Sequence, residues 1–324
     1  MPVLLLSGFL GSGKTTLVNA MLRDPRLAGT AVAVNEFGTI PIDHDLIDHG
    51  EDQTIVLANG CLCCNLAGDL ESAMMRLFTR RRDGSVPRFD RLIVEPSGLS
   101  DPAPIAQAIL RNPMMARVMR FAGIVTLVDA QFGQAQLARH PETRKQVALA
   151  ETILLTKTDL VAGTGPLAAA VRDINATAPI LTAEQGLIDP GRLFPADFLH
   201  PGLPPVPRSL LAADPADTAH TGRFEAAALT ADVPLDWRRF EAWLKSIRLT
   251  HADDLLRVKG ILHVAGVDGP VVVQGVHHVI NHPVALDAWP SPDRRSRLVL
   301  IADPGTIRQA RKSWAAALSD LVAT

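Results

Sequence analysis

The chain contains no tyrosine, and aromatic residues make up only 4% of its 324 residues. Neither sign of charge dominates, since 32 Lys and Arg stand against 34 Asp and Glu, for a net charge of −2. Nucleic-acid-binding surfaces usually combine a basic face with aromatic side chains on which bases stack. We therefore expect no nucleic acid partner.

Long apolar runs and signal peptides are also missing, so we expect neither a membrane span nor export. Cysteine is scarce: the chain has 3, and all lie between positions 61 and 64. A disulfide framework needs an even number of cysteines at wider spacing. These absences favour a reducing cytoplasm.

Residues 8–15, with the sequence G-F-L-G-S-G-K-T, complete the phosphate-loop pattern G-x-x-x-x-G-K-[ST]. The apolar run Val3–Leu6 precedes them as a buried strand would, and the helix-forming stretch Thr16–Arg23 follows. Backbone N–H groups at such a helix start bind phosphate. A chance glycine turn is the alternative. We expect a bound nucleoside triphosphate, with Lys14 at its β- and γ-phosphates and Thr15 on Mg²⁺. The nucleotide-binding residues predicted here are Gly8, Gly11, Ser12, Gly13, Lys14, Thr15 and Thr16.

The three cysteines, Cys61, Cys63 and Cys64, form the cluster G-C-L-C-C. Three thiols in a reducing compartment suit a soft metal such as Zn²⁺ or Cu(I). A structural zinc site normally has four protein ligands, so a fourth position is left for Glu36, a histidine or solvent. An incomplete site favours an exchangeable ion. A redox-active or simply buried cysteine cluster is the alternative.

Strands and helices are expected to alternate through the first part of the chain, which predicts βαβ units and a mostly parallel sheet. A proline-rich stretch follows, and then a pattern typical of a small α+β domain with an antiparallel sheet. The fold class is thus α/β: a P-loop domain, residues 1–190; a linker or crossover, residues 191–222; and an α+β domain, residues 223–324. Strands are expected at 3–6, 31–34, 54–57, 91–94, 123–128 and 152–155, then at 223–229, 255–264, 271–279 and 297–301. Helices are expected at 16–23, 66–80, 102–111, 142–149 and 167–176, then at 235–247 and 307–321.

Two further strand ends carry residues that a nucleotide site needs. Glu95 ends an apolar strand, where a carboxylate that orients water or Mg²⁺ belongs, and Gly98 lets the backbone approach a γ-phosphate. Thr156, Lys157 and Asp159 form a T-K-x-D pattern at the end of another strand. A carboxylate there accepts from guanine N1 and N2, a donor pair that adenine lacks, so GTP is expected rather than ATP. A surface turn is the alternative for this short pattern.

The loop after the strand at 31–34 starts with N-E-F-G and continues to Asp43, Asp45 and Asp48. Such a loop can become ordered around a γ-phosphate and Mg²⁺. A solvated acidic loop is the alternative. We favour Glu36 over Asp43 as its functional residue.

Taken in order, G-F-L-G-S-G-K-T, N-E-F-G, G-C-L-C-C, E-P-S-G-L-S-D-P and T-K-T-D resemble the CobW-type metal-chaperone GTPases, a group that includes UreG and HypB. The resemblance is tight from Val3 to about Asp159 and looser in the C-terminal segment. It implies a Ras-like GTPase domain, Mg²⁺-dependent GTP hydrolysis, and a metal site at Cys61, Cys63, Cys64 and Glu36. It further implies that hydrolysis releases the metal to a client metalloprotein.

The chain departs from the family pattern in three places. Thr156 replaces the usual asparagine of N-K-x-D, which removes an amide near the base. The stretch 212–222 holds only His220 where many members carry a histidine-rich run. The sequence begins almost at its first strand, so we expect no N-terminal extension that docks a client.

His277 and His278 are expected on one strand, where adjacent side chains face opposite ways, so a shared metal is not expected.

The first functional hypothesis is a slow GTPase that loads a divalent metal, Zn²⁺ by preference, into a client protein. Co²⁺ for cobalamin assembly and activation of a metalloenzyme fit the same motifs. A small-molecule kinase is a rival that predicts acceptor-dependent nucleotide consumption. A GTP-controlled binding module with a structural zinc is another. The sequence leaves the client and the oligomeric state open.

Overall fold

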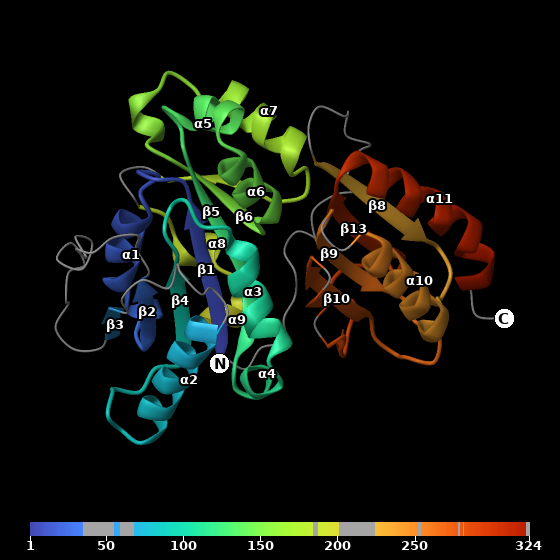
Figure 1. Cartoon of the computed structure of the whole chain (residues 1–324), viewed down its shortest axis with the longest axis horizontal. Coiled ribbons are helices and arrows are strands. Elements are labelled where there is room, and N and C mark those ends of the chain that lie inside the picture. The colour runs from blue at the N-terminus through green and yellow to red at the C-terminus, as the bar shows by residue number, and fades with distance from the viewer. Residues whose placement is uncertain are drawn as a thin grey trace. The chain divides into compact units, whose positions relative to one another are not determined.

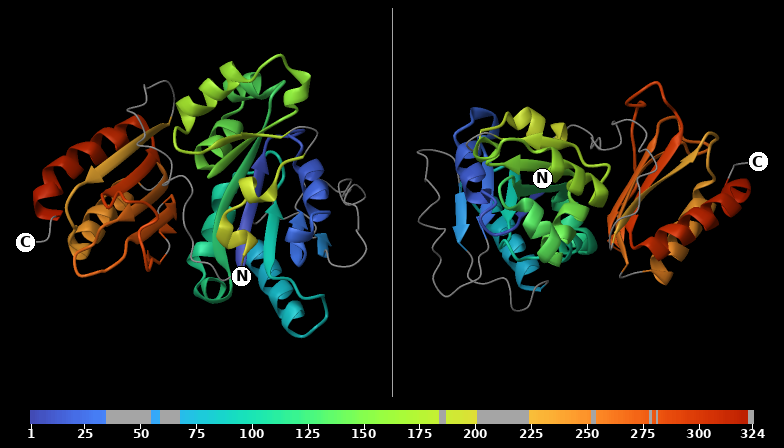
Figure 2. Two further views of the ribbon diagram at one scale, coloured as in Figure 1. Left: turned by 180° about the vertical axis from the view of Figure 1, so that it is seen from behind. Right: turned by 90° about the horizontal axis from the view of Figure 1, so that it is seen from above.

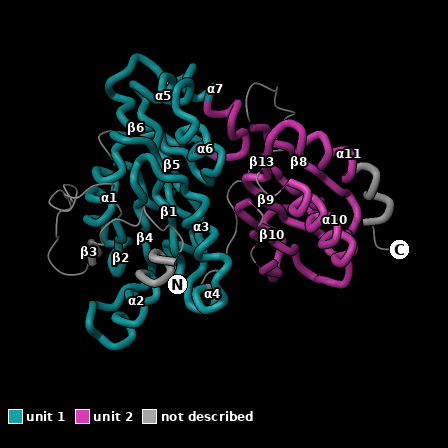
Figure 3. Tube along the Cα trace, in the orientation of Figure 1, with its two compact units in different colours: residues 1–170, 179–205 teal, residues 171–178, 206–324 magenta. Residues whose placement is uncertain are grey.

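The computed structural model describes residues 1–34, 55–58, 68–183, 187–200, 224–251, 254–277, 279–280 and 282–321, with the backbone alone at 55–58, 68–73, 116 and 315–321. The chain divides into two compact units (Figure 3). Unit 1 comprises residues 1–170 and 179–205, and unit 2 comprises residues 171–178 and 206–324. In the described part of the chain, no helix is both long and apolar enough to cross a membrane.

Unit 1 is built on a seven-stranded sheet in which every pair of neighbouring strands is parallel. All residues of its central strand β1 are buried, as expected for a sheet covered on both faces. The strand order is β3-β2-β4-β1-β5-β6-β7. The strands are β1 (Pro2–Gly8), β2 (Thr30–Val34), β3 (Ile55–Ala58), β4 (Arg91–Glu95), β5 (Arg120–Asp129), β6 (Thr152–Thr156) and β7 (Ile180–Thr182).

Helices lie on both faces of this sheet (Figures 1 and 2). One face packs against side chains of α1, such as Leu17 and Met21, and against Leu193 and Phe198 of α8 and α9. The helices of unit 1 are α1 (Lys14–Leu22), α2 (Gly68–Arg82), α3 (Pro102–Arg111), α4 (Pro113–Val118), α5 (Gly133–Arg139), α6 (Pro141–Leu149), α7 (Gly165–Ile174), α8 (Pro190–Leu193) and α9 (Ala196–Leu199), with the 3-10 turns η1 (Pro25–Leu27) and η2 (Thr158–Leu160).

The register of the strands places the predicted site residues along one edge of the sheet. Glu95 pairs with Val34, the last residue of β2, and Asp129 pairs with Thr156. Gly8 ends β1 beside Leu127 of β5. The carboxyl ends of β2, β4, β1, β5 and β6 therefore lie side by side, where ligands bind in open α/β sheets.

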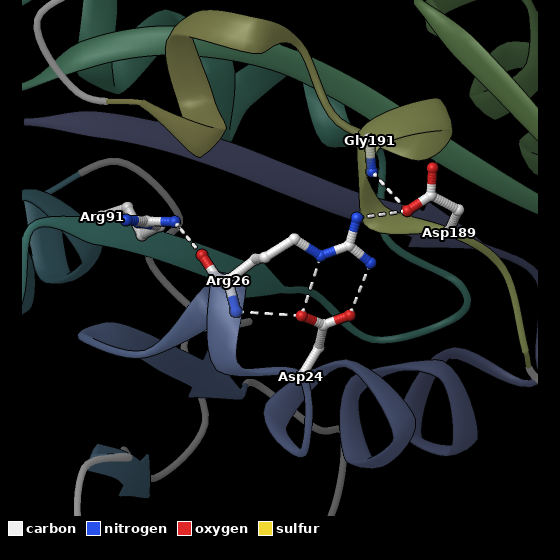
Figure 4. Close-up of polar contacts among 5 residues, drawn as sticks. All are labelled: Asp24, Arg26, Arg91, Asp189 and Gly191. Carbon is white, nitrogen blue, oxygen red and sulfur yellow. Dashed lines mark hydrogen bonds and ion pairs between the residues drawn. The ribbon is translucent and has the colours of Figure 1, made fainter.

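A charged cluster occupies the opposite, amino edge of the same sheet (Figure 4). Arg26 pairs with Asp24 at 2.7 Å and with Asp189 at 2.5 Å, and its carbonyl accepts from Arg91 at the start of β4. Hydrogen bonds from the Arg26 side chain hold the pKa values of both carboxyl groups below their usual range. This cluster ties η1 to the segment before α8 and lies away from the nucleotide motifs.

The prediction of a linker at residues 191–222 is wrong at its start. Helices α8 and α9 occupy that position, and Phe194 and Phe198 are buried in the core of unit 1. Pro190 begins α8, and the Asp189 side chain caps it by accepting from Gly191. Two four-residue helices are too short to give a periodic pattern. The prediction of a linker was therefore based on the prolines near them.

Unit 2 is an α+β domain whose six-stranded sheet is antiparallel throughout, as predicted. Two helices pack on it around an aromatic core in which Trp243 and Trp314 meet edge to face, 4.9 Å apart. The strand order is β11-β10-β9-β13-β8, and β12 pairs with β10. The elements are β8 (Glu225–Ala231), α10 (Trp237–Thr250), β9 (Leu255–Leu262), β10 (Val271–Val276), β11 (Val279–Ile280), β12 (Val284–Ala285), β13 (Ser296–Ala302) and α11 (Pro304–Leu321).

The strand predicted at 271–279 is interrupted by a turn. Val276 of β10 pairs with Val279 of β11, so two residues connect these antiparallel strands. His277, the first of them, has φ 53, a conformation typical of hairpin turns rather than strands. The expectation that His277 and His278 lie on one strand is therefore wrong, and His278 itself lies outside the described residues.

Candidate nucleotide site

The phosphate loop joins β1 to α1 through three glycines with positive φ: Gly8 (145°), Gly11 (73°) and Gly13 (90°). A Cβ on Gly8 would lie 2.6 Å from the carbonyl oxygen of Leu127. Gly13 is the N-cap of α1 and has no side chain to accept from the first-turn N–H groups. Those N–H groups and the helix dipole favour an anion at this position.

Lys14 and Thr15, the first residues of α1, lie over the loop and against β4. The Lys14 ammonium donates to the carbonyls of Gly8 at 2.9 Å and Phe9 at 3.4 Å. The Thr15 hydroxyl donates to Glu95 Oε1 at 3.2 Å. Glu95 is only 3% exposed, so its carboxylate meets the Thr15 hydroxyl at a position beside the phosphate loop that is largely buried from solvent. This oxygen pair fits Mg²⁺ bound to phosphate.

Gly98 brings the loop after β4 against the phosphate loop. A Cβ on Gly98 would lie 2.6 Å from the backbone nitrogen of Leu10 and 2.9 Å from its Cα. Only glycine allows these two backbones to approach so closely. The structure therefore places Gly98 next to the predicted phosphate cradle.

Replacing Gly98 with alanine should push this loop away from the phosphate loop, at a cost of about 1–3 kcal/mol for overpacking. We expect weaker binding of a non-hydrolysable GTP analogue, measured by calorimetry. Gly165→Ala is the matched control, because a Cβ on Gly165 meets nothing within 4 Å. Equal affinities in the two variants would show that the close approach at Gly98 has no part in nucleotide binding.

Thr156 connects the T-K-x-D pattern to the phosphate loop. Its hydroxyl donates to the Ser12 carbonyl at 2.8 Å, so threonine ties these two segments together without the amide of N-K-x-D. Lys157 adopts the left-handed conformation with φ 55, and Asp159 is exposed in η2. The structure thus places Thr156 against the phosphate loop and leaves Asp159 exposed.

Residues 2–182 match the CobW/HypB/UreG nucleotide-binding domain, and residues 224–318 match the cobalamin synthesis protein cobW C-terminal domain. The chain belongs to the CobW/HypB/UreG family. Zinc chaperone YjiA of Escherichia coli (strain K12) is 34% identical over 282 residues, which are 86% of this chain and 87% of that protein. Zinc-regulated GTPase metalloprotein activator 1 of Schizosaccharomyces pombe is 29% identical over 197 residues, 58% of this chain and 47% of that one.

The crystal structure of Zn(II)-bound YjiA GTPase from E. coli superposes with a TM-score of 0.71 at 27% identity and covers 98% of each chain. Unit 1 of this CobW/HypB/UreG member therefore has the P-loop GTPase fold, and unit 2 is a separate antiparallel domain. The predicted fold class and family are confirmed.

The proposed metal ligands of this family member, Glu36, Cys61, Cys63 and Cys64, lie outside the described residues, as do Asp43, Asp45 and Asp48. Among the residues that are described, no group of three His, Cys, Asp or Glu side chains is placed to hold a metal ion. Strands β2 and β3 pair in parallel and end together at Val34 and Ala58. Val34 and Ala58, the last described residues before the predicted ligands in sequence, thus lie at the same edge of the sheet as the nucleotide motifs.

Asp129 is a residue of this site that the motifs did not reveal. It ends β5, is 2% exposed, and pairs with the Lys157 ammonium at 2.6 Å. Its other oxygen accepts from the backbone nitrogens of Gln131 and Phe132. A lone aspartate at the end of an apolar strand was the only signal available. Asp129 therefore fixes the side chain of Lys157, the lysine of the T-K-x-D pattern.

Asp129→Asn should keep both turn hydrogen bonds while losing the charge that holds Lys157. We expect GDP to dissociate about tenfold faster, which corresponds to a loss of ~1.4 kcal/mol in the free energy of GDP binding. Stopped-flow release of a fluorescent GDP measures it. Asp24→Asn is the matched control, since Asp24 also caps a turn and pairs with a cation, but at the far end of α1. Unchanged GDP release in Asp129→Asn would contradict a role for this pair in nucleotide binding.

Proposed function

We propose that this chain is a GTPase that couples its nucleotide state to binding a divalent metal, Zn²⁺ by preference, and to delivering it to a client protein. The observation that carries this proposal is the contact between Thr15, beside the phosphate loop, and the buried Glu95 at the end of β4. It joins the helix N-terminus that suits phosphate to the oxygen ligands that suit Mg²⁺. The family and its GTPase relatives support the same activity.

In this proposal each described residue has a separate task. Lys14 would exchange its carbonyl partners for the β- and γ-phosphates, and Thr15 would hold Mg²⁺, which would neutralise charge on the triphosphate. Glu95 would orient the attacking water or a water on the metal. Gly98 offers its backbone N–H to the γ-phosphate. Within the described part of the site, we assign no arginine to stabilise the charge on the transferring phosphate. We therefore expect slow intrinsic turnover.

We propose GTP and GDP as the nucleotides because of Lys157 and Asp159. The Asp159 carboxylate is exposed, as a group that accepts from guanine N1 and N2 must be before the base binds. Lys157 is held by Asp129 at the same edge. Thr156 supports this arrangement through Ser12. Adenine lacks the donor pair, so ATP should bind more weakly.

We propose Cys61, Cys63, Cys64 and Glu36 as ligands of the transported metal. Three thiolates and a carboxylate suit Zn²⁺, and two relatives are named as a zinc chaperone and a zinc-regulated activator. Co²⁺ is the alternative cargo. Because Val34, the last described residue before Glu36, pairs with Glu95 on one side and Ala58 on the other, we propose that a response to the γ-phosphate also changes the metal ligands.

The client is expected to be a metalloprotein in the cytoplasm, where thiolates remain reduced. We propose residues 1–190 as the nucleotide and metal part, extended by α8 and α9 up to residue 199. Residues 223–324 then form the domain that meets the client, and the intervening stretch connects them.

Phosphate release from GTP and ATP, with and without candidate small-molecule acceptors, tests the catalytic part. The proposal predicts GTP hydrolysis that needs Mg²⁺ but no acceptor. Consumption only in the presence of an acceptor would establish a kinase instead. Chelation of zinc followed by circular dichroism tests the metal part: the fold should persist, whereas unfolding would indicate a structural zinc.

A further inference from the structure

Gln146 is a buried polar residue to which the site described above gives no task. It lies in α6 and is 1% exposed. Its side-chain nitrogen donates to the carbonyl oxygens of Gly98 at 3.0 Å and Ser100 at 3.1 Å. Because both partners are acceptors, only the NH₂ end of the amide can face them. Gln146 thus holds the loop that approaches the phosphate loop.

Among the residues that the structure describes, the Gln146 amide makes hydrogen bonds with only one of its two ends. Its amide oxygen is buried and has no hydrogen-bond partner within the described ranges, which costs free energy. The two hydrogen bonds of the NH₂ group offset this cost, and an apolar side chain of the same length would leave both carbonyl oxygens without this donor. The contribution of the amide therefore lies in holding the two carbonyls of this loop.

Helix α6 is well placed to transmit this restraint. The Thr126 hydroxyl of β5 donates to the Gln146 backbone carbonyl at 3.0 Å, which anchors the helix to the sheet. At the N-terminal end of α6, the His140 ring contacts the Phe9 ring of the phosphate loop, with centroids 4.6 Å apart. One helix thus contacts both loops that surround the predicted triphosphate position.

We propose that Gln146 is a positioning residue for the γ-phosphate, an inference that rests on the proposed GTPase function. Carbonyl oxygens that faced the triphosphate would repel it. Gln146 binds those of Gly98 and Ser100, which keeps them directed toward α6. The Gly98 N–H then remains the group that this loop presents to the γ-phosphate. GDP has no γ-phosphate, so its binding should not depend on Gln146.

Gln146→Met in the full-length chain tests the proposal, because methionine has nearly the same length and no donor. We expect kcat for GTP to fall about tenfold, as for a misaligned donor, with similarly weaker binding of a non-hydrolysable GTP analogue. The GDP dissociation constant should stay within about twofold of the wild-type value. Glu142→Gln is the control: Glu142 is an exposed residue of the same helix, and its substitution leaves the amide contacts and the anchor of α6 in place, so kcat should be retained.

All 4 tryptophans lie after residue 236, so tryptophan fluorescence reports on unit 2. The unfolding of unit 1 must therefore be followed by circular dichroism. Gln146→Met should fold but unfold at a lower temperature than the wild type, because the Gly98 and Ser100 carbonyls lose their donor. If it fails to fold, Gln146→Asn replaces it, since the shorter amide cannot reach both carbonyls. An unchanged kcat and an unchanged ratio of GTP-analogue to GDP affinity in a folded variant would overturn the proposal. Equal losses for GDP and the analogue would also overturn it, by indicating a merely structural residue.

The proposed function can fail separately. If the wild-type chain does not hydrolyse GTP, the function is wrong, and the analogue-to-GDP affinity ratio still decides the role of Gln146. If GTP is hydrolysed but zinc affinity does not respond to nucleotide, the coupling fails while the effect of Gln146→Met on kcat remains decisive.

Discussion

Replacing Lys14 with alanine should lower the rate of GTP hydrolysis at saturating GTP by about a thousandfold, the effect of losing a cation preorganised at the transferring phosphate. The Lys14 ammonium already lies over the loop, 2.9 Å from the Gly8 carbonyl. It therefore reaches bound phosphates with little rearrangement. A phosphate-release assay under single-turnover conditions measures the chemical step itself.

Lys245→Ala serves as the control for this variant. Lys245 is an exposed lysine on α10 in unit 2, so its removal changes the net charge equally without altering the loop. Hydrolysis within a few-fold of the wild-type rate in Lys14→Ala, with nucleotide bound, would show that the phosphate loop binds a ligand but does not catalyse.

Glu95→Gln should lower kcat by about a hundredfold and raise the Mg²⁺ concentration needed for half-maximal rate. The amide oxygen can still accept from Thr15, so the loop should keep its shape while the negative charge beside the metal position is lost. The Glu95 side chain is almost fully buried, and burying a neutral amide costs less than burying a charged carboxylate. The substitution should therefore not destabilise the fold. Phosphate release across a Mg²⁺ titration measures both effects.

Glu241→Gln on α10 is the corresponding control, since that glutamate is exposed. A full rate with an unchanged Mg²⁺ requirement in Glu95→Gln would exclude Glu95 from the hydrolytic site. A lower rate with the same Mg²⁺ requirement would assign Glu95 to the attacking water alone.

Local patterns predicted the sheet of unit 1 well because its strands are apolar runs punctuated by glycine and by site residues. All six predicted strands of unit 1 are present, while the three-residue β7 gave no pattern. Short helices such as α4, α8 and α9 were missed. They depend on caps at Asn112 and Asp189 and on tertiary packing rather than on periodicity.

The motifs likewise located Lys14, Thr15 and Glu95, but not their supporting residues. Asp129 is 28 residues from Lys157 in sequence, and Gln146 is 48 residues from Gly98. Neither residue belongs to a motif, and each finds its partner only through the order of the parallel strands. Supporting residues of this kind need the fold before they can be recognised.

The Zn²⁺ dissociation constant, measured without nucleotide, with Mg²⁺·GDP and with Mg²⁺ and a non-hydrolysable GTP analogue, tests the central claim most directly. Cys63→Ala, which removes one proposed ligand, is the control. We predict at least a tenfold difference between nucleotide states, a coupling of about 1.4 kcal/mol that must appear equally in nucleotide affinity when zinc is bound. Equal zinc affinities in all three states would contradict the proposed coupling.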